Sequence, residues 1–138
     1  MTSSKLSVEN IQKFLTGGNA TVTIVNPETG NRFTYKIRQK DNDGAKTPFF
    51  VSVLSGQDNE SDFSYIGFIR DGDFIHGGRK ARAGSGAPSV RAFSWFWRNR
   101  QNPSPAEVWH EGRCGRCGRK LTVPESIEDG FGPTCKNF

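Results

Sequence analysis

The spacing of hydrophobic residues predicts a short helix close to the start of the chain. Apolar side chains recur three and four positions apart after the N-cap residue Ser7, and a glycine pair at 17–18 supplies a stop. The apolar positions are Val8, Ile11, Phe14 and Leu15. One face of this segment is therefore apolar, which is typical of a helix that packs on a sheet.

In the next segment, hydrophobic and polar residues alternate. Residues 20–24 and 33–37 alternate between apolar and polar side chains, and the turn sequence Asn-Pro-Glu-Thr-Gly at 26–30 lies between them. We predict a β-hairpin with one wet, basic face, because its polar positions include three cations. These are Arg32, Lys36 and Arg38.

A second hairpin is predicted from residues 49–54 and 63–69, which are rich in aromatic and β-branched residues. The sequence Asp71-Gly72-Asp73 then indicates a turn between strands. The N-terminal half therefore predicts a helix packed on a mostly antiparallel sheet of four or five strands, since a small sheet needs a covering element.

The middle of the chain combines a basic loop with an aromatic helix. Residues 77–88 are rich in glycine and lack apolar periodicity. Ser89 can cap a helix that runs to about residue 101, where Asn-Pro-Ser-Pro ends it. This helix has too many apolar residues for one stripe, so it is covered on more than one side or uses one side for binding. For Trp95 and Trp97 we expect core packing.

The predicted fold class is α+β, with an N-terminal helix, a small antiparallel sheet, an aromatic helix and a C-terminal zinc-knuckle module. The expected segments are 1–76 for helix and sheet, 77–88 for the basic loop, 89–105 for the aromatic helix and 106–138 for the zinc-knuckle module. No apolar run approaches the roughly 18 residues of a membrane helix, and the N-terminus resembles neither a secretory signal nor a transit peptide. We expect a cytoplasmic protein.

Three cysteines in the last 25 residues predict a zinc site. Cys114 and Cys117 form a C-x2-C knuckle with glycine after each cysteine, and Cys135 follows a second glycine-rich turn. Two thiolates at this spacing can reach one zinc ion at about 2.3 Å. An odd number of cysteines does not form a disulfide framework, so we expect structural zinc in a reducing compartment.

A structural zinc site usually has four ligands, so one is missing from the cysteines. His110 lies four residues before Cys114 and is the expected fourth ligand. Asp129, Glu111, the distant His76 and a ligand from another chain are the alternatives.

The cysteine-rich sequence also resembles a known kind of domain. HEGRCGRCGRKLT at 110–122, PESI at 124–127 and GFGPTC at 130–135 resemble a domain of unknown function found in small phage-encoded and bacterial proteins. Residues 92–95 and the hairpin at 26–35 look like what precedes that domain in phage proteins. The resemblance implies a bacteriophage origin and a zinc-knuckle tail, but no established activity.

Positive charge is concentrated in the second half of the chain. Residues 1–70 have a net charge of +1, whereas residues 74–123 carry ten basic and two acidic residues, a net charge of +8. This distribution is typical of a surface that meets phosphates or another acidic partner. The candidate binding residues are Arg79, Lys80, Arg82, Arg91, Arg98, Arg100, Arg113, Arg116, Arg119 and Lys120.

These features favour a protein that binds DNA or RNA through a basic surface containing aromatic residues. The alternative is an anti-defence regulator, similar to an anti-CRISPR protein, that binds and inhibits a host nuclease or defence complex. An enzyme is the weakest hypothesis, because the chain has no Walker-type loop and no evident Ser-His-Asp arrangement. The pair Asp71 and Asp73 could hold a cation, but a turn is the favoured interpretation.

Overall fold

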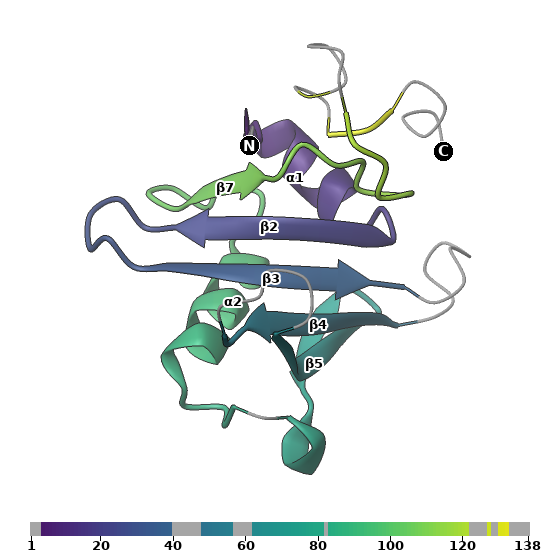
Figure 1. Ribbon diagram of the computed structural model, residues 1–138. Coiled ribbons are helices and arrows are strands. Elements are labelled where there is room, and N and C mark those ends of the chain that lie inside the picture. The colour runs from purple at the N-terminus through teal and green to yellow at the C-terminus, as the bar shows by residue number, and fades with distance from the viewer. Residues whose placement is uncertain are drawn as a thin grey trace.

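The computed structural model describes residues 4–39, 48–56, 62–81, 83–121, 127 and 130–132. Within these residues, two α-helices accompany a seven-stranded antiparallel sheet of order β1-β7-β2-β3-β4-β5-β6 (Figure 1). The helices are α1 (Val8–Leu15) and α2 (Pro88–Arg98), and η1 (Gly78–Lys80) is a short 3-10 helix. The strands are β1 (Ser4–Lys5), β2 (Asn19–Val25), β3 (Arg32–Arg38), β4 (Phe49–Leu54), β5 (Phe63–Arg70), β6 (Asp73–His76) and β7 (Glu107–His110).

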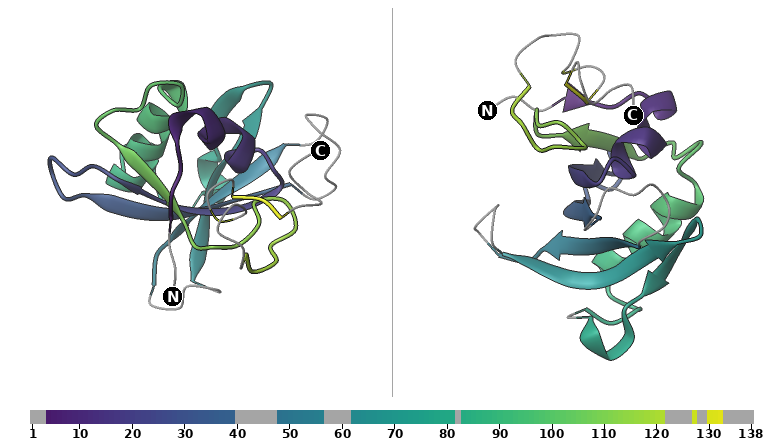
Figure 2. Two further views of the ribbon diagram at one scale, coloured as in Figure 1. Left: turned by 90° about the horizontal axis from the view of Figure 1, so that it is seen from above. Right: turned by 90° about the vertical axis from the view of Figure 1, so that its right-hand side faces the viewer.

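Both α-helices lie on the same face of the sheet (Figure 2). Strand β2 alternates between half-buried and buried positions, and its buried residues Ala20, Val22 and Ile24 belong to the core. The polar positions of β2 and β3 point to the other face, because successive side chains of a strand alternate. The α+β class expected from the sequence is therefore confirmed, and one face of the sheet is left without a helix among the described elements.

Aromatic packing fixes α2 to the sheet. The centre of the Phe93 ring lies 4.9 Å from the ring centres of both Tyr35 and Phe74. The Tyr35 hydroxyl donates a 2.6 Å hydrogen bond to the Ser89 carbonyl, and burial raises the pKa of this phenol. Trp97 is buried as expected, whereas Trp95 is 40% exposed. The expectation of core packing is therefore correct for Trp97 and wrong for Trp95, which lies on the outer side of the helix.

The predicted local elements agree with the structure. Helix α1, the hairpin of β2 and β3, and the hairpin of β4 and β5 lie where the hydrophobic patterns placed them. Asp71 and Gly72 have φ values of 54° and 82° and join β5 to β6 in a two-residue turn, as a primed hairpin turn requires. The aromatic helix begins at Pro88 and ends at Arg98, slightly earlier than expected. No helix of the described residues is long and apolar enough to span a membrane.

Strand β7 joins the start of the expected C-terminal module to the sheet. This strand pairs with β2 on one side, where His110 faces Val22, and with β1 on the other, where Trp109 faces Lys5. Residues 107–110 were expected to begin an appended module at 106, but they form part of the sheet. Four residues are too few for their alternation to distinguish a strand, and both partner strands are distant in sequence.

Candidate functional site

The C-x2-C sequence forms a tight loop that leaves β7. A bridge between Arg113 and Lys120 closes the loop, and the Cys114 amide donates a 2.8 Å hydrogen bond to the Arg119 carbonyl. The Gly118 amide donates back to the Cys114 carbonyl at 2.9 Å. Gly118 has a φ of +79°, a conformation that glycine adopts without the steric cost of a Cβ atom. The glycine after the second cysteine therefore has a backbone role in the turn.

The two cysteines of this loop differ in exposure. Cys114 is buried, whereas Cys117 is exposed, and both are free thiols in the described chain. The Arg116 amide donates to the Cys114 sulfur at 3.5 Å. Burial raises the pKa of Cys114, but hydrogen bonds from the amides of Cys117, Gly132 and Arg116 and from the Cys117 side chain outweigh burial and lower this pKa to about 7. Backbone amides directed at a sulfur favour the thiolate, which is the form that binds metals.

The loop is packed against the body of the protein. The Gly115 carbonyl accepts a 2.8 Å hydrogen bond from the Asn19 amide, and the Gly115 amide donates to the Gly130 carbonyl at 2.9 Å. A Cβ atom on Gly115 would lie 2.8 Å from the Phe14 ring, and one on Gly130 would lie 2.5 Å from it. Close packing of Phe14 against these two glycines therefore joins α1, the loop and its return segment.

His110 is buried just before the loop, and both of its ring nitrogens are engaged. Nε2 lies 2.6 Å from the Ile127 carbonyl, and the Gly112 amide donates to Nδ1 at 3.0 Å. A carbonyl can only accept, so Nε2 carries the proton and Nδ1 is the acceptor. Burial lowers the pKa of His110, although the bond to Ile127 opposes this shift. A neutral imidazole follows from these contacts.

These contacts do not support His110 as the fourth zinc ligand. Its only lone pair suited to a metal is directed at the Gly112 amide, so ligation would require that hydrogen bond to break. In the described part of the chain, no group of three His, Cys, Asp or Glu side chains is gathered for a metal. Cys135 and Asp129 lie outside the described residues.

The alternative ligand His76 belongs to another part of the fold. It ends β6, at the edge of the sheet opposite β1. Its Nε2 lies 2.8 Å from the Ala83 carbonyl, and its Nδ1 accepts from the Gly78 amide at 3.2 Å. His76 therefore fixes the start of the segment 77–88 and does not join the two cysteines.

A basic groove of about 340 Å³ lies beside the cysteine loop. It runs between the solvent-facing side of β2 and β3 and the residues that follow β7. Its lining residues are Asn19, Thr21, Lys36, Arg38, Glu111, Arg113 and Gly118. Three cations and one carboxylate face this hollow, so it has the charge and the open shape suited to an anion.

The structure divides the predicted binding residues between separate places. Arg91 and Arg98 are exposed on α2, which covers one face of the sheet, whereas Arg113, Arg119 and Lys120 are exposed around the cysteine loop. Arg79 and Lys80 are exposed in η1, and Arg116 is half-buried. Arg100 donates to Gln12 and lies 4.1 Å from the Trp97 ring centre. Arg82 lies outside the described residues. These cations therefore do not form one continuous surface.

Further candidate residues lie on the face of the sheet that carries no described helix. The charge count of residues 74–123 did not include them. Lys36 and Arg38 line the groove, and the period-two pattern of the first hairpin had already placed them on one wet face. The aromatic residues Phe50, Tyr65 and Trp109 share this face through the strand register. No local sequence signal joins them, because they come from three strands.

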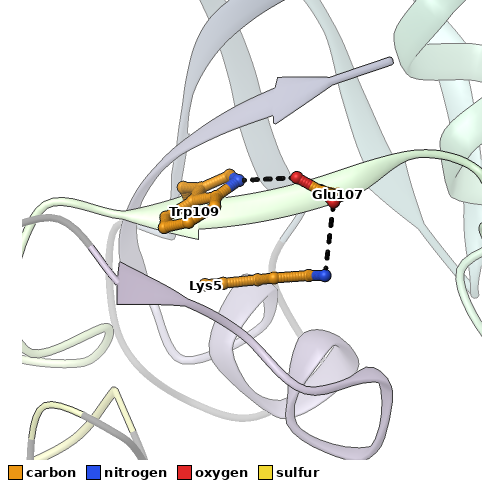
Figure 3. Close-up of polar contacts among 3 residues, drawn as sticks. All are labelled: Lys5, Glu107 and Trp109. Atoms are coloured by element: carbon orange, nitrogen blue, oxygen red, sulfur yellow. Dashed lines mark hydrogen bonds and ion pairs between the residues drawn. The ribbon is translucent and has the colours of Figure 1, made fainter. Parts of the chain in front are cut away.

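A polar cluster occupies the β1 and β7 end of this face (Figure 3). Glu107 accepts a 3.3 Å hydrogen bond from the Trp109 indole and forms a 3.3 Å ion pair with Lys5. The side chains of Lys5 and Glu107 are 54% and 30% exposed, so the pair contributes only about 0 to 1 kcal/mol. Its effect is to hold the indole and to neutralise the Glu107 carboxylate on this face.

The C-terminal part of the chain is similar to a known family. Residues 104–136 match the family of unknown function DUF6011, a segment that includes β7 and the cysteine loop. The expected resemblance to a domain of unknown function is confirmed for this segment. No curated protein and no solved structure matches the chain.

Proposed function

We propose that this protein is a zinc-stabilised nucleic-acid-binding protein and not an enzyme. In this proposal, phosphates bind in the basic groove beside the cysteine loop. The observation that carries the proposal is the convergence of Lys36 and Arg38 from β3 with Arg113 from the segment after β7. Lysine and arginine supply most of the contacts that proteins make to phosphates, and those contacts dominate nucleic-acid affinity.

The zinc ion is proposed to be held by Cys114, Cys117 and Cys135. The fit rests on the donor chemistry of the loop: two thiols separated by two residues, a backbone amide directed at the buried sulfur and a glycine that allows the turn. Bound zinc would fix the short loop, which has few apolar side chains of its own, in the position that carries Arg113. This role is structural, and His110 is assigned to support the loop beside the site.

The test is binding of zinc-loaded protein to fluorescently labelled DNA and RNA at two salt concentrations. The proposal expects affinity that falls steeply with added salt, because each phosphate contact releases counterions. Arg113→Ala is expected to weaken binding. It should also reduce the slope of log affinity against log salt by about one, because one phosphate contact is lost. Absence of binding to every nucleic acid at low salt would contradict the proposal.

The alternative function is binding to a host protein complex, as a phage-encoded inhibitor would do. One observation favours it: Trp95 on α2 is 40% exposed and lies between hollows of about 520 and 420 Å³. Arg91 and Arg98 line the larger hollow, and exposed tryptophan and arginine are typical of interface hot spots. Trp95→Ala should abolish capture of that partner while leaving nucleic-acid binding unchanged. Phage origin and a cytoplasmic location remain predictions from the sequence.

A further inference from the structure

We infer that the helix-free face of the sheet stacks the bases of a single-stranded nucleic acid, so that single strands are preferred over duplexes. This inference rests on the proposed function and specifies its substrate class. The surface concerned, called the open face, comprises the outward side chains of β2 to β6. Figure 2 shows that α1 and α2 both lie on the opposite side of the sheet.

The strand register arranges the open face in rows. In the first row, Arg38 of β3 faces Phe50 of β4, which faces Phe68 of β5, which faces Ile75 of β6. Paired strands lie about 4.8 Å apart, so these four residues form a continuous line across the sheet. A cation at the groove is thus followed by two aromatic rings.

A second row lies two residues away on β3 and β4 and three residues away on β5, where a bulge opposite Val51 and Ser52 shifts the register. Thr21 of β2 faces Lys36, Lys36 faces Ser52, and Ser52 faces Tyr65. The two rows are about 7 Å apart along the strands. The ring of Tyr65 reaches back to that of Phe50, with 6.2 Å between their centres. Both rows carry their cation on β3 and their aromatic rings on β4 or β5, which matches a chain that has phosphates along one side and bases along the other.

Two apolar side chains of the open face are exposed to solvent. Phe50 is 46% exposed and Ile75 is 41% exposed, although the solvated face of an antiparallel sheet is usually polar. Neither side chain belongs to the core formed on the other face. The aromatic line formed by Phe50 and Phe68 ends at the cationic groove. It is therefore available for a ligand that has both flat rings and negative charge.

Cations and rings are interleaved on this face. The Lys36 ammonium lies 4.3 Å from the centre of the Phe63 ring, and the Arg70 guanidinium lies 5.5 Å from that of Phe68. The charges are thus held beside the aromatic surface, where they can also meet phosphates. A purely apolar protein partner would have to desolvate these cations, which disfavours it as the occupant.

The aromatic line selects between single strands and duplexes. Every base has a flat face that can stack on an aromatic side chain, but in a duplex those faces are covered by neighbouring base pairs. Phosphates are accessible in both forms. Contacts from Lys36 and Arg38 therefore contribute to the binding of both, whereas contacts from Phe50 contribute only to single strands.

The experiment compares the full-length zinc-loaded protein with its variants by fluorescence anisotropy, using a 15-nucleotide oligo-dT and a 15-base-pair duplex. Phe50→Ala is expected to weaken oligo-dT binding by about five- to 150-fold, to leave duplex binding unchanged and to keep the same salt dependence. Phe50→Trp should retain the affinity, because an aromatic ring is kept. Trp95→Ala, an exposed aromatic on the other side of the molecule, is the matched control and should have no effect.

Three results would contradict either the stacking inference or the proposed function. If Phe50→Ala binds oligo-dT as well as the unmodified protein does while Arg38→Ala weakens binding, the stacking inference is overturned and the proposed function stands. If neither oligonucleotide binds at low salt, the proposed function itself fails. If sedimentation shows a dimer that Phe50→Ala dissociates, the open face joins two copies of the chain and the inference is overturned as well.

Discussion

His110 donates a 2.6 Å hydrogen bond from Nε2 to the backbone carbonyl of Ile127, 17 residues later in the chain. Its other ring nitrogen accepts from the Gly112 amide. One buried side chain therefore holds both the segment that enters the cysteine loop and the segment that follows it. The contact gives the histidine at the end of β7 a structural role beside the cysteine loop.

Replacing His110 separates an anchoring role from metal ligation. His110→Ala is expected to lower the free energy of unfolding by about 1 to 3 kcal/mol, because the Ile127 carbonyl and the Gly112 amide lose their partner. His110→Gln should restore part of this stability, since an amide can both donate and accept. Both variants should retain one zinc per chain by elemental analysis. A folded His110 variant without zinc would show instead that the imidazole is a ligand.

The cysteine variants test the zinc proposal. Cys114→Ser and Cys135→Ser are each expected to lose zinc, and removal of zinc from the unmodified protein by a chelator should lower its thermal stability in the same way. Thermal unfolding with and without chelator, together with the zinc content of each variant, measures these effects. Full stability in both variants would contradict a structural role for the metal.

Two arginines on opposite sides of the sheet test where phosphates bind. Arg38→Ala, in the groove, should weaken nucleic-acid binding across sequences and reduce the slope of log affinity against log salt by about one. Arg91→Ala removes the same charge from α2 and is the matched control. Equal losses in the two variants would indicate diffuse electrostatic attraction, and a larger loss for Arg91→Ala would move the site to the helix.

The glycines beneath the cysteine loop test its packing on the body. Gly115→Ala places a methyl group 2.8 Å from the Phe14 ring and 3.1 Å from the Phe14 carbonyl oxygen, so we expect a loss of about 1 to 3 kcal/mol. Gly132→Ala meets nothing within 4 Å and is the control in the same segment. Denaturant unfolding of both variants measures the difference. Equal stability of the two would show that the loop is not tightly packed against α1.

Local patterns in the sequence determined most of the individual elements of this protein. The apolar spacing around Phe14 predicted α1, the alternation around Lys36 predicted the β2 and β3 hairpin, and Asp71-Gly72 predicted a turn. The C-x2-C spacing indicated a cysteine loop, and glycine at 118 supplies its left-handed backbone position. These predictions succeed because each depends on residues that are neighbours in the chain.

The tertiary structure alone decided how these elements combine. It placed β7 between β1 and β2, turned His110 into a buried anchor, and separated Arg91 from Arg113 although both belong to the basic half of the sequence. It also brought Arg38, Phe50 and Phe68 into one row across three strands. Strand order and register depend on contacts between distant segments, and a charge count or a helical period carries no information about those contacts.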